Sequence, residues 1–244
     1  KAFALFHLAE IYGERNELDS ALMFAKQNKL LWGEVSDDRF LYLDWRTMYF
    51  KLLFRNGAKE LSLKGYEEIL SNKADVIKDD AKTLNFEIDY VELLIKSGEI
   101  DKANELITKY ISHHSETANE KSPNDYMNAL LRAYKTYLRI VNTDLLSERI
   151  NDYGEKIHLQ VLGGLKTINM LNSSYKTNAD RVRQLNFQDE FFNGAIPVMY
   201  SLYDTTTDFV YLETIYQLME LSKNNSLLEA FNRNIALNAA IIPD

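Results

Sequence analysis

The sequence predicts an all-α protein, a right-handed superhelical α-solenoid of antiparallel helix pairs. Its turn residues recur at a fixed interval, since Asn16, Gly57 and Gly98 lie 41 residues apart, each between two stretches of helical apolar spacing. The chain of 244 residues has only three prolines and nine glycines, which favours long helices over a β-sandwich or barrel. Repeated helix hairpins bury their apolar faces against neighbouring hairpins, so an extended array is expected.

Composition excludes several classes of function. Hydrophobic residues make up 46% of the chain, which is enough for a buried core. The absence of cysteine excludes disulfides, thiolate zinc sites and a cysteine nucleophile within this chain, and the net charge of −8 disfavours nucleic-acid binding. No apolar run approaches the roughly 20 residues of a membrane span. We expect no cofactor, no catalytic residues, no enzymatic activity and a cytoplasmic location.

Three hairpins are predicted in the first 114 residues. The six helices lie at about 2–13, from Leu18, at about 38–56, after Gly57, at about 80–96 and at about 100–113. The sequences of the first and third hairpins align directly, and Ala21 aligns with Ala103. A small residue at this position lets the two helices of a hairpin approach closely. The second hairpin is the weakest match, because Ser62 stands at that position. Leu61 and Tyr66 are expected to point inward.

Longer, more divergent hairpins are predicted over residues 122–244. The polar stretch 112–122 is expected to be a loop, with His113-His114 solvated rather than bound to metal, Ser122 as a helix cap and Pro123 at the first helical position. The remaining helices are expected to end near Val141, with a turn at Asn142, to cover 145–172 as one helix or two broken near Gly163-Gly164, to cover about 178–203, and to run from Phe209 to Ala240. No linker interrupts residues 1–244, so we expect one continuous array.

The first and third hairpins resemble the tetratricopeptide repeat (TPR). The residues at that motif's packing positions are Leu8, Ala9, Tyr12, Leu18 and Ala21 in the first hairpin, and Tyr90, Leu94, Gly98, Ile100 and Ala103 in the third. The spacing of 41 residues is longer than the 34 residues of the family. The resemblance therefore implies divergent repeats and a role in binding proteins or peptides.

The last sixty residues resemble the region that joins TPR arrays to CHAT domains, the caspase-like peptidase relatives found in many bacteria. The matching residues are Glu220, Ser222, Lys223, Leu227, Leu228, Ile242 and Pro243. The resemblance implies that a CHAT module, with its catalytic His and Cys, lies beyond Asp244. Since the chain also opens at Lys1 within an apolar, periodic segment, we expect it to be a piece of a longer bacterial protein.

These features predict a non-catalytic region that binds a protein or peptide partner and regulates an attached CHAT module. Two alternatives stay open. One is the TPR sensor region of a bacterial histidine kinase or transcription regulator, and the other is a stand-alone scaffold or chaperone. The gene sequence after Asp244 would separate the three.

A binding groove is expected on the first helix of each hairpin, as the resemblance to TPR arrays implies. The residues assigned to it are Phe6, Glu10 and Glu14 from the first hairpin and Ile88, Glu92 and Lys96 from the third. Phe6 and Ile88 would supply apolar contacts. The three glutamates would make the groove acidic, which predicts a basic or amphipathic peptide as the partner.

We expect the double substitution Glu10→Lys with Glu92→Lys to abolish binding of a partner captured from a lysate of the parent organism, because it reverses the charge of the groove. Wild-type binding should also weaken as salt rises, since exposed charges are screened beyond about 8 Å at physiological ionic strength. Binding isotherms measure the effect, and circular dichroism checks that helicity is retained. Unchanged affinity would move the site to the long C-terminal helices.

Overall fold

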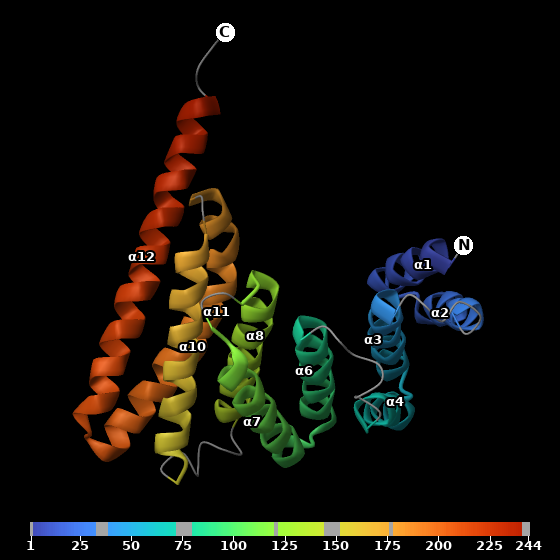
Figure 1. The fold of residues 1–244 in the computed structure, drawn as a ribbon, viewed down its shortest axis with the longest axis horizontal. Coiled ribbons are helices and arrows are strands. Elements are labelled where there is room, and N and C mark those ends of the chain that lie inside the picture. Colours follow the sequence, from blue (N-terminus) through green and yellow to red (C-terminus); the bar gives the residue numbers. More distant parts are fainter. Residues whose placement is uncertain are drawn as a thin grey trace. The chain divides into compact units, whose positions relative to one another are not determined.

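Ten α-helices form most of the residues that the computed structural model describes, which are residues 2–32, 39–71, 80–119, 122–143, 152–175 and 178–240 (Figure 1). Within these ranges no residue belongs to a β-strand. The predicted all-α fold class is therefore confirmed. The handedness of the superhelix stays a prediction.

The helices lengthen toward the C-terminus, as the sequence predicts. The first seven contain 13 to 18 residues, and the following three contain 21, 29 and 32 residues. Their bounds are α1 (Ala2–Glu14), α2 (Leu18–Trp32), α3 (Arg39–Arg55), α4 (Lys59–Ser71), α6 (Asp80–Ser97), α7 (Ile100–Thr117), α8 (Asn124–Val141), α10 (Gly154–Ser174), α11 (Asn178–Thr206) and α12 (Phe209–Ala240).

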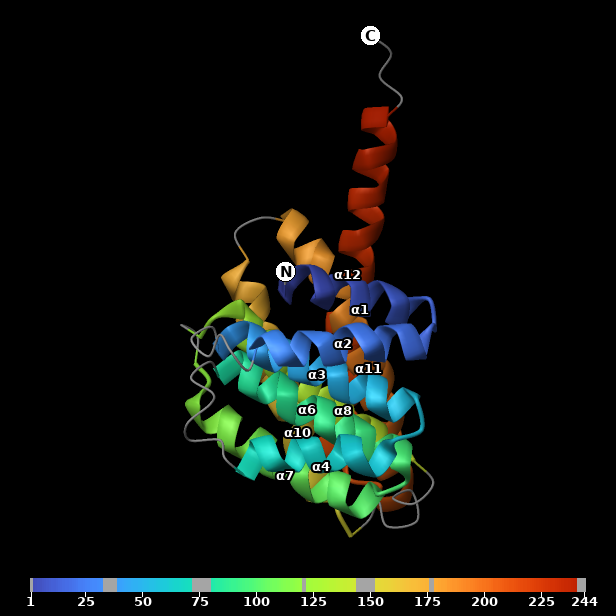
Figure 2. The ribbon, with the colours of Figure 1, turned by 90° about the vertical axis from the view of Figure 1, so that its right-hand side faces the viewer.

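Contacts divide the chain into two units, Lys1–Ala103 and Asn104–Asp244. In the first unit α1 packs on α2, α2 on α3, α3 on α4 and α4 on α6, and α3 also contacts both α1 and α6 (Figure 2). In the second unit α8 packs on α10, α10 on α11 and α11 on α12, and α8 contacts α11 while α10 contacts α12. Within each unit, the first helix of a hairpin therefore contacts both helices of the preceding hairpin.

The turns of the first three hairpins share one conformation. Asn16, Gly57 and Gly98 have positive φ angles of 62°, 87° and 84°. Each turn closes with the same two backbone hydrogen bonds, the pattern of a Schellman helix end. In the first turn the N–H of Glu17 donates to the carbonyl of Tyr12 at 2.9 Å, and equivalent bonds occur at residues 58 and 99. The predicted turns, including the one at Asn142 after α8, are confirmed.

One small residue in each of the first three hairpins is completely buried. Ala21, Ser62 and Ala103 each have no exposed surface, and they are 41 residues apart. Ser62 fits this buried site because its hydroxyl donates to the carbonyl oxygen of Phe50 at 2.8 Å. The second hairpin, the weakest match by sequence, therefore keeps the structural register of the other two.

The glycine pair in α10 does not break the helix, which is continuous from Gly154 to Ser174. A Cβ atom on Gly163 would lie 2.4 Å from the Tyr134 hydroxyl of α8, and one on Gly164 would lie 2.3 Å from the Phe191 ring of α11. Both distances are shorter than real Cβ contacts. The two glycines therefore allow aromatic rings from both neighbouring helices to pack against α10. The predicted start of this segment at Leu145 lies outside the described residues.

The loop predicted at residues 112–122 is shorter than expected. Helix α7 continues to Thr117, so His113 and His114 are helical rather than in a loop. His113 is exposed, as predicted, whereas the prediction that His114 is solvated is wrong. His114 is only 4% exposed, and its carbonyl accepts a hydrogen bond from the Tyr126 hydroxyl at 2.8 Å. The helix extends because Tyr126 of α8 covers its last turn.

The predicted cap of α8 is also wrong. Pro123 is the N-cap residue rather than the first helical residue, and no side chain caps the helix. The Ser122 hydroxyl instead accepts a hydrogen bond from the backbone N–H of Asn119 at 3.0 Å. It closes the preceding loop rather than the helix end. At the start of α12, by contrast, a side chain does cap the helix, because Asp208 accepts a hydrogen bond from the N–H of Val210 at 3.1 Å.

We expect Ala21→Leu or Ala103→Leu to lower the free energy of unfolding by about 1–3 kcal/mol, because a larger side chain overpacks a site with no exposed surface. The matched control Ala4→Leu, at an exposed position of α1, should change it by less than about 0.5 kcal/mol. Urea unfolding followed by circular dichroism measures both effects. An unfolding midpoint for Ala21→Leu equal to that of the wild type would contradict the close approach of α1 and α2.

Candidate binding surfaces

The groove residues predicted on α1 form a partly exposed acidic face. Phe6 and Glu10 are half-buried, and Glu14 is exposed. The Phe6 ring lies 5.5 Å from the His7 ring, and a Glu10 carboxylate oxygen lies 2.9 Å from His7 Nδ1. Glu10 and Glu14 are four residues apart, so their side chains lie on the same face of the helix.

The groove residues predicted on α6 differ in exposure. Ile88 has no exposed surface, Glu92 is half-buried and Lys96 is exposed. A side chain with no exposed surface packs in the core and cannot contact a ligand, so Ile88 is removed from the predicted groove. That the other five residues form one groove stays a prediction.

A charged cluster connects three helices at the end of the first unit. Oε1 of Glu67 on α4 accepts hydrogen bonds from the Tyr90 hydroxyl of α6 at 2.6 Å and from Lys102 Nζ of α7 at 2.7 Å. The bond from Lys102, and then the bond from Tyr90, lower the pKa of Glu67. Burial, followed by the bond to Glu67, raises the pKa of Tyr90 to about 12. These residues lie 12 to 35 positions apart in sequence, which is why sequence reasoning missed the cluster.

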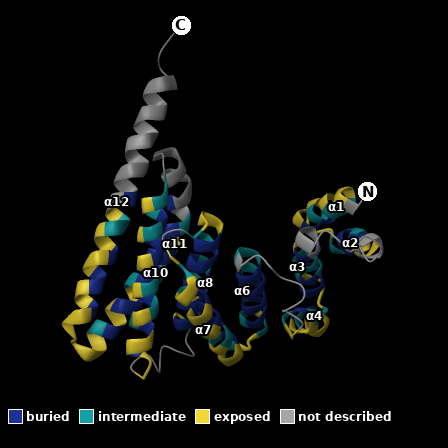
Figure 3. Cartoon of the chain, in the orientation of Figure 1, coloured by how far each residue is buried: buried dark blue, intermediate teal, exposed yellow. Residues whose placement is uncertain are grey.

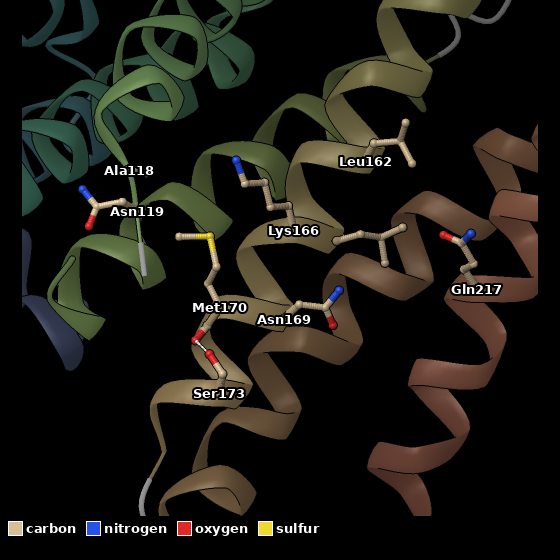
Figure 4. A pocket seen from close by; sticks show the side chains of 9 residues that line it. Ala118, Asn119, Leu162, Lys166, Asn169, Met170, Ser173 and Gln217 are labelled. Carbon is tan, nitrogen blue, oxygen red and sulfur yellow. Dashed lines mark hydrogen bonds between the residues drawn. The ribbon is translucent and has the colours of Figure 1, made fainter. Parts of the chain in front are cut away.

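A hollow of about 700 Å³ lies against α10 in the second unit (Figure 4). Its lining comes from Leu162, Leu165, Lys166, Asn169, Met170 and Ser173 of α10, from Ala118 and Asn119 just after α7, and from Gln217 of α12. The α10 residues are spaced by one, three or four positions and share one helix face. The hollow is therefore built from second helices of hairpins, whereas the groove predicted from the sequence lies on first helices.

Helix α12 has two apolar faces. Ile215 and Leu218 are 7% and 0% exposed, and form part of the core. A second row, which we call the α12 stripe, is exposed to solvent (Figure 3). The α12 stripe consists of Phe209 (69% exposed), Leu212 (39%), Tyr216 (66%) and Met219 (55%). No helix of the described residues covers this row, which the sequence alone could not show.

The described residues show no arrangement suited to metal chemistry. No group of three or more His, Cys, Asp or Glu among them could hold a metal ion.

His158 of α10 is half-buried, and its Nε2 lies 2.8 Å from the Thr214 hydroxyl of α12. Burial lowers the pKa of this histidine. Its contact with Thr214 joins two helices.

None of the described helices has the length and apolar character that crossing a membrane requires.

Comparison with known proteins identifies the fold. No protein-family model matches the chain, and no curated protein sequence matches it. Solved structures do match it, among them two of "kinesin light chain nearly identical TPR-like repeats" from Podosopora anserina. One, a single-substitution variant, is 10% identical and covers 95% of both chains with a TM-score of 0.55. The other is 12% identical, with a TM-score of 0.53 over 88% of this chain and 93% of that chain.

The chain has a TPR-like fold. At such low identity the similarity shows the arrangement of helices and does not transfer a ligand. The TPR resemblance carried by the first and third hairpins is thus confirmed at the level of the fold.

We expect the pH dependence of stability to report the Glu67 cluster. A carboxylate whose pKa is lowered by folding contributes stability above its unfolded pKa and loses it as pH falls through the folded pKa. Between pH 5 and 8, the free energy of unfolding of the wild type should exceed that of Glu67→Gln by less than about 1 kcal/mol, because the Glu67–Lys102 ion pair is partly exposed. The difference should shrink toward zero below about pH 4.

Urea unfolding at each pH measures this difference, with Glu105→Gln, at an exposed position of α7, as the matched control. A difference between wild type and Glu67→Gln that stays constant down to pH 2.5, well below the usual carboxyl pKa of about 4.3, would contradict the ion-pair assignment.

Proposed function

We propose that this chain is a non-catalytic, protein-binding repeat region that recruits a partner and regulates an attached CHAT-type peptidase module. The TPR-like fold supports a binding role, because stacked hairpins present extended surfaces. The likeness of the C-terminal residues to CHAT-linked arrays supports the attached module. Of those residues, Glu220, Ser222 and Lys223 lie on α12, whereas Ile242 and Pro243 lie outside the described residues.

The α12 stripe is the observation that carries this proposal. Its four side chains follow one another at intervals of three and four residues, so the row extends about 15 Å along the helix. Contiguous exposed apolar patches of this kind mark interaction sites in soluble proteins. The same helix carries the residues that resemble the CHAT boundary. We therefore assign the attached module as the occupant of the α12 stripe.

Photo-crosslinking in the full-length parent protein tests this assignment. The probe is p-benzoylphenylalanine in place of Tyr216, and the matched control is the same probe in place of Phe3, which is 59% exposed on α1. We expect the probe at position 216, but not at position 3, to crosslink to the module encoded after Asp244. Mass spectrometry of the digested protein locates the crosslinks.

Regulation is tested with the double substitution Leu212→Asp and Tyr216→Asp, which should change the peptidase activity of the attached module. Leu61→Asp is the control, because Leu61 is 57% exposed on α4, contrary to the inward position that the sequence predicts. Equal activity in all three proteins, or no crosslink at position 216, would contradict the proposed role of the α12 stripe. A kinase core, a DNA-binding module or a stop codon after Asp244 would favour one of the alternative functions instead.

A further inference from the structure

The hollow against α10 carries a charge opposite to that of the whole chain. Lys166 is the one ionisable side chain among its described lining residues, although the net charge of the protein is −8. Lys166 is exposed and makes no ion pair or hydrogen bond with another described residue. A carboxylate that entered the hollow would meet this ammonium group without displacing a protein partner.

Two carboxamides of the lining are also free of partners among the described residues. Asn169 extends from α10 and Gln217 from α12, with Gln217 and Asn119 on opposite sides of α10 (Figure 4). Each carboxamide offers an N–H donor and a C=O acceptor. The backbone of an extended peptide offers the same two groups, so a carboxamide can bond it in two places.

Three other amides, one from each of α10, α11 and α12, do have partners. Gln188 of α11 donates to Asn172 Oδ1 of α10 at 3.0 Å and accepts from Asn225 Nδ2 of α12 at 3.1 Å. These amides connect helices and have their partners. Asn169 and Gln217 instead leave donors and acceptors available at the hollow.

Apolar side chains stand one helical turn on each side of the cation. Leu162 precedes Lys166 by four residues and Met170 follows it by four, and both line the hollow. Four helical residues rise about 6 Å. Side chains on one face of an extended peptide repeat every two residues, at about 6.6 Å. A peptide along α10 can therefore present apolar, acidic and apolar side chains at alternate positions to these three residues.

We propose that the hollow binds an extended segment of a partner protein with the pattern apolar–x–acidic–x–apolar. The acidic side chain pairs with Lys166, the apolar side chains contact Leu162 and Met170, and the peptide backbone bonds to Asn169 and Gln217. This inference rests on the proposed binding role and deepens it by naming the ligand. The ligand is opposite in charge to the basic peptide predicted for the first helices, so the two surfaces are distinguishable.

Fluorescence anisotropy tests the proposal with the 244-residue chain and a labelled peptide, Ser-Leu-Ser-Glu-Ser-Leu-Ser. We expect saturable binding that weakens with added salt. Lys166→Glu should weaken it by at least about tenfold, because a charge-assisted hydrogen bond is replaced by repulsion. Lys166→Arg should retain binding, since the charge remains. The matched control Lys156→Glu reverses an exposed charge on the same helix away from the hollow and should bind as the wild type does.

A peptide with Lys in place of Glu should bind Lys166→Glu more tightly than it binds the wild type. Equal loss in Lys156→Glu and Lys166→Glu, or no wild-type binding at millimolar peptide, would overturn the proposal. If the peptide fails to bind while the probe at position 216 still crosslinks the attached module, the inference about the hollow falls and the proposed function stands.

Discussion

The close approach of paired helices at one small residue per hairpin is the constraint on which the array depends. Ala21, Ser62 and Ala103 have no exposed surface, so a longer side chain there would force the two helices apart. The buried apolar side chains of these hairpins, including Leu94 and Trp45, could then no longer meet at core density. The left-handed turn residue before each site is equally constrained, because it fixes the angle at which the second helix returns.

The longer hairpins of the second unit are held in register by polar contacts as well. Apolar packing alone allows two long helices to align in several registers of similar energy, since leucine and isoleucine side chains can replace one another in these contacts at little cost in free energy. The hydrogen bonds from Asn172 through the buried Gln188 to the buried Asn225 are satisfied in one register. A slip of one turn would leave buried donors or acceptors unpaired, at about 1–3 kcal/mol each. The glycines at 163 and 164 add a steric constraint, because only that register places Tyr134 and Phe191 over them.

This architecture lets one chain carry surfaces of different chemistry. Each hairpin packs on its neighbours, so the side chains that face solvent on one helix are little constrained by those elsewhere. Helix α1 presents carboxylates, α12 presents the apolar α12 stripe, and the hollow against α10 presents a lysine with carboxamides. An acidic chain can therefore contain a local cationic site. That separation suits the proposed contacts with both a recruited partner and an attached module.

The sequence by itself determined the helices, the turns and the 41-residue register, because these follow from local interactions. A positive φ angle favours glycine or asparagine, and apolar side chains at helical spacing mark the buried row of a hairpin. The tertiary structure alone decided which apolar rows are covered. Leu61 is exposed, Ile88 is buried, and the α12 stripe faces solvent, although all have the same helical spacing. The physical reason is that periodicity identifies a face, whereas burial also requires a neighbouring helix to lie against it. The hollow and the Glu67 cluster arose in the same way, from residues that only packing brings together.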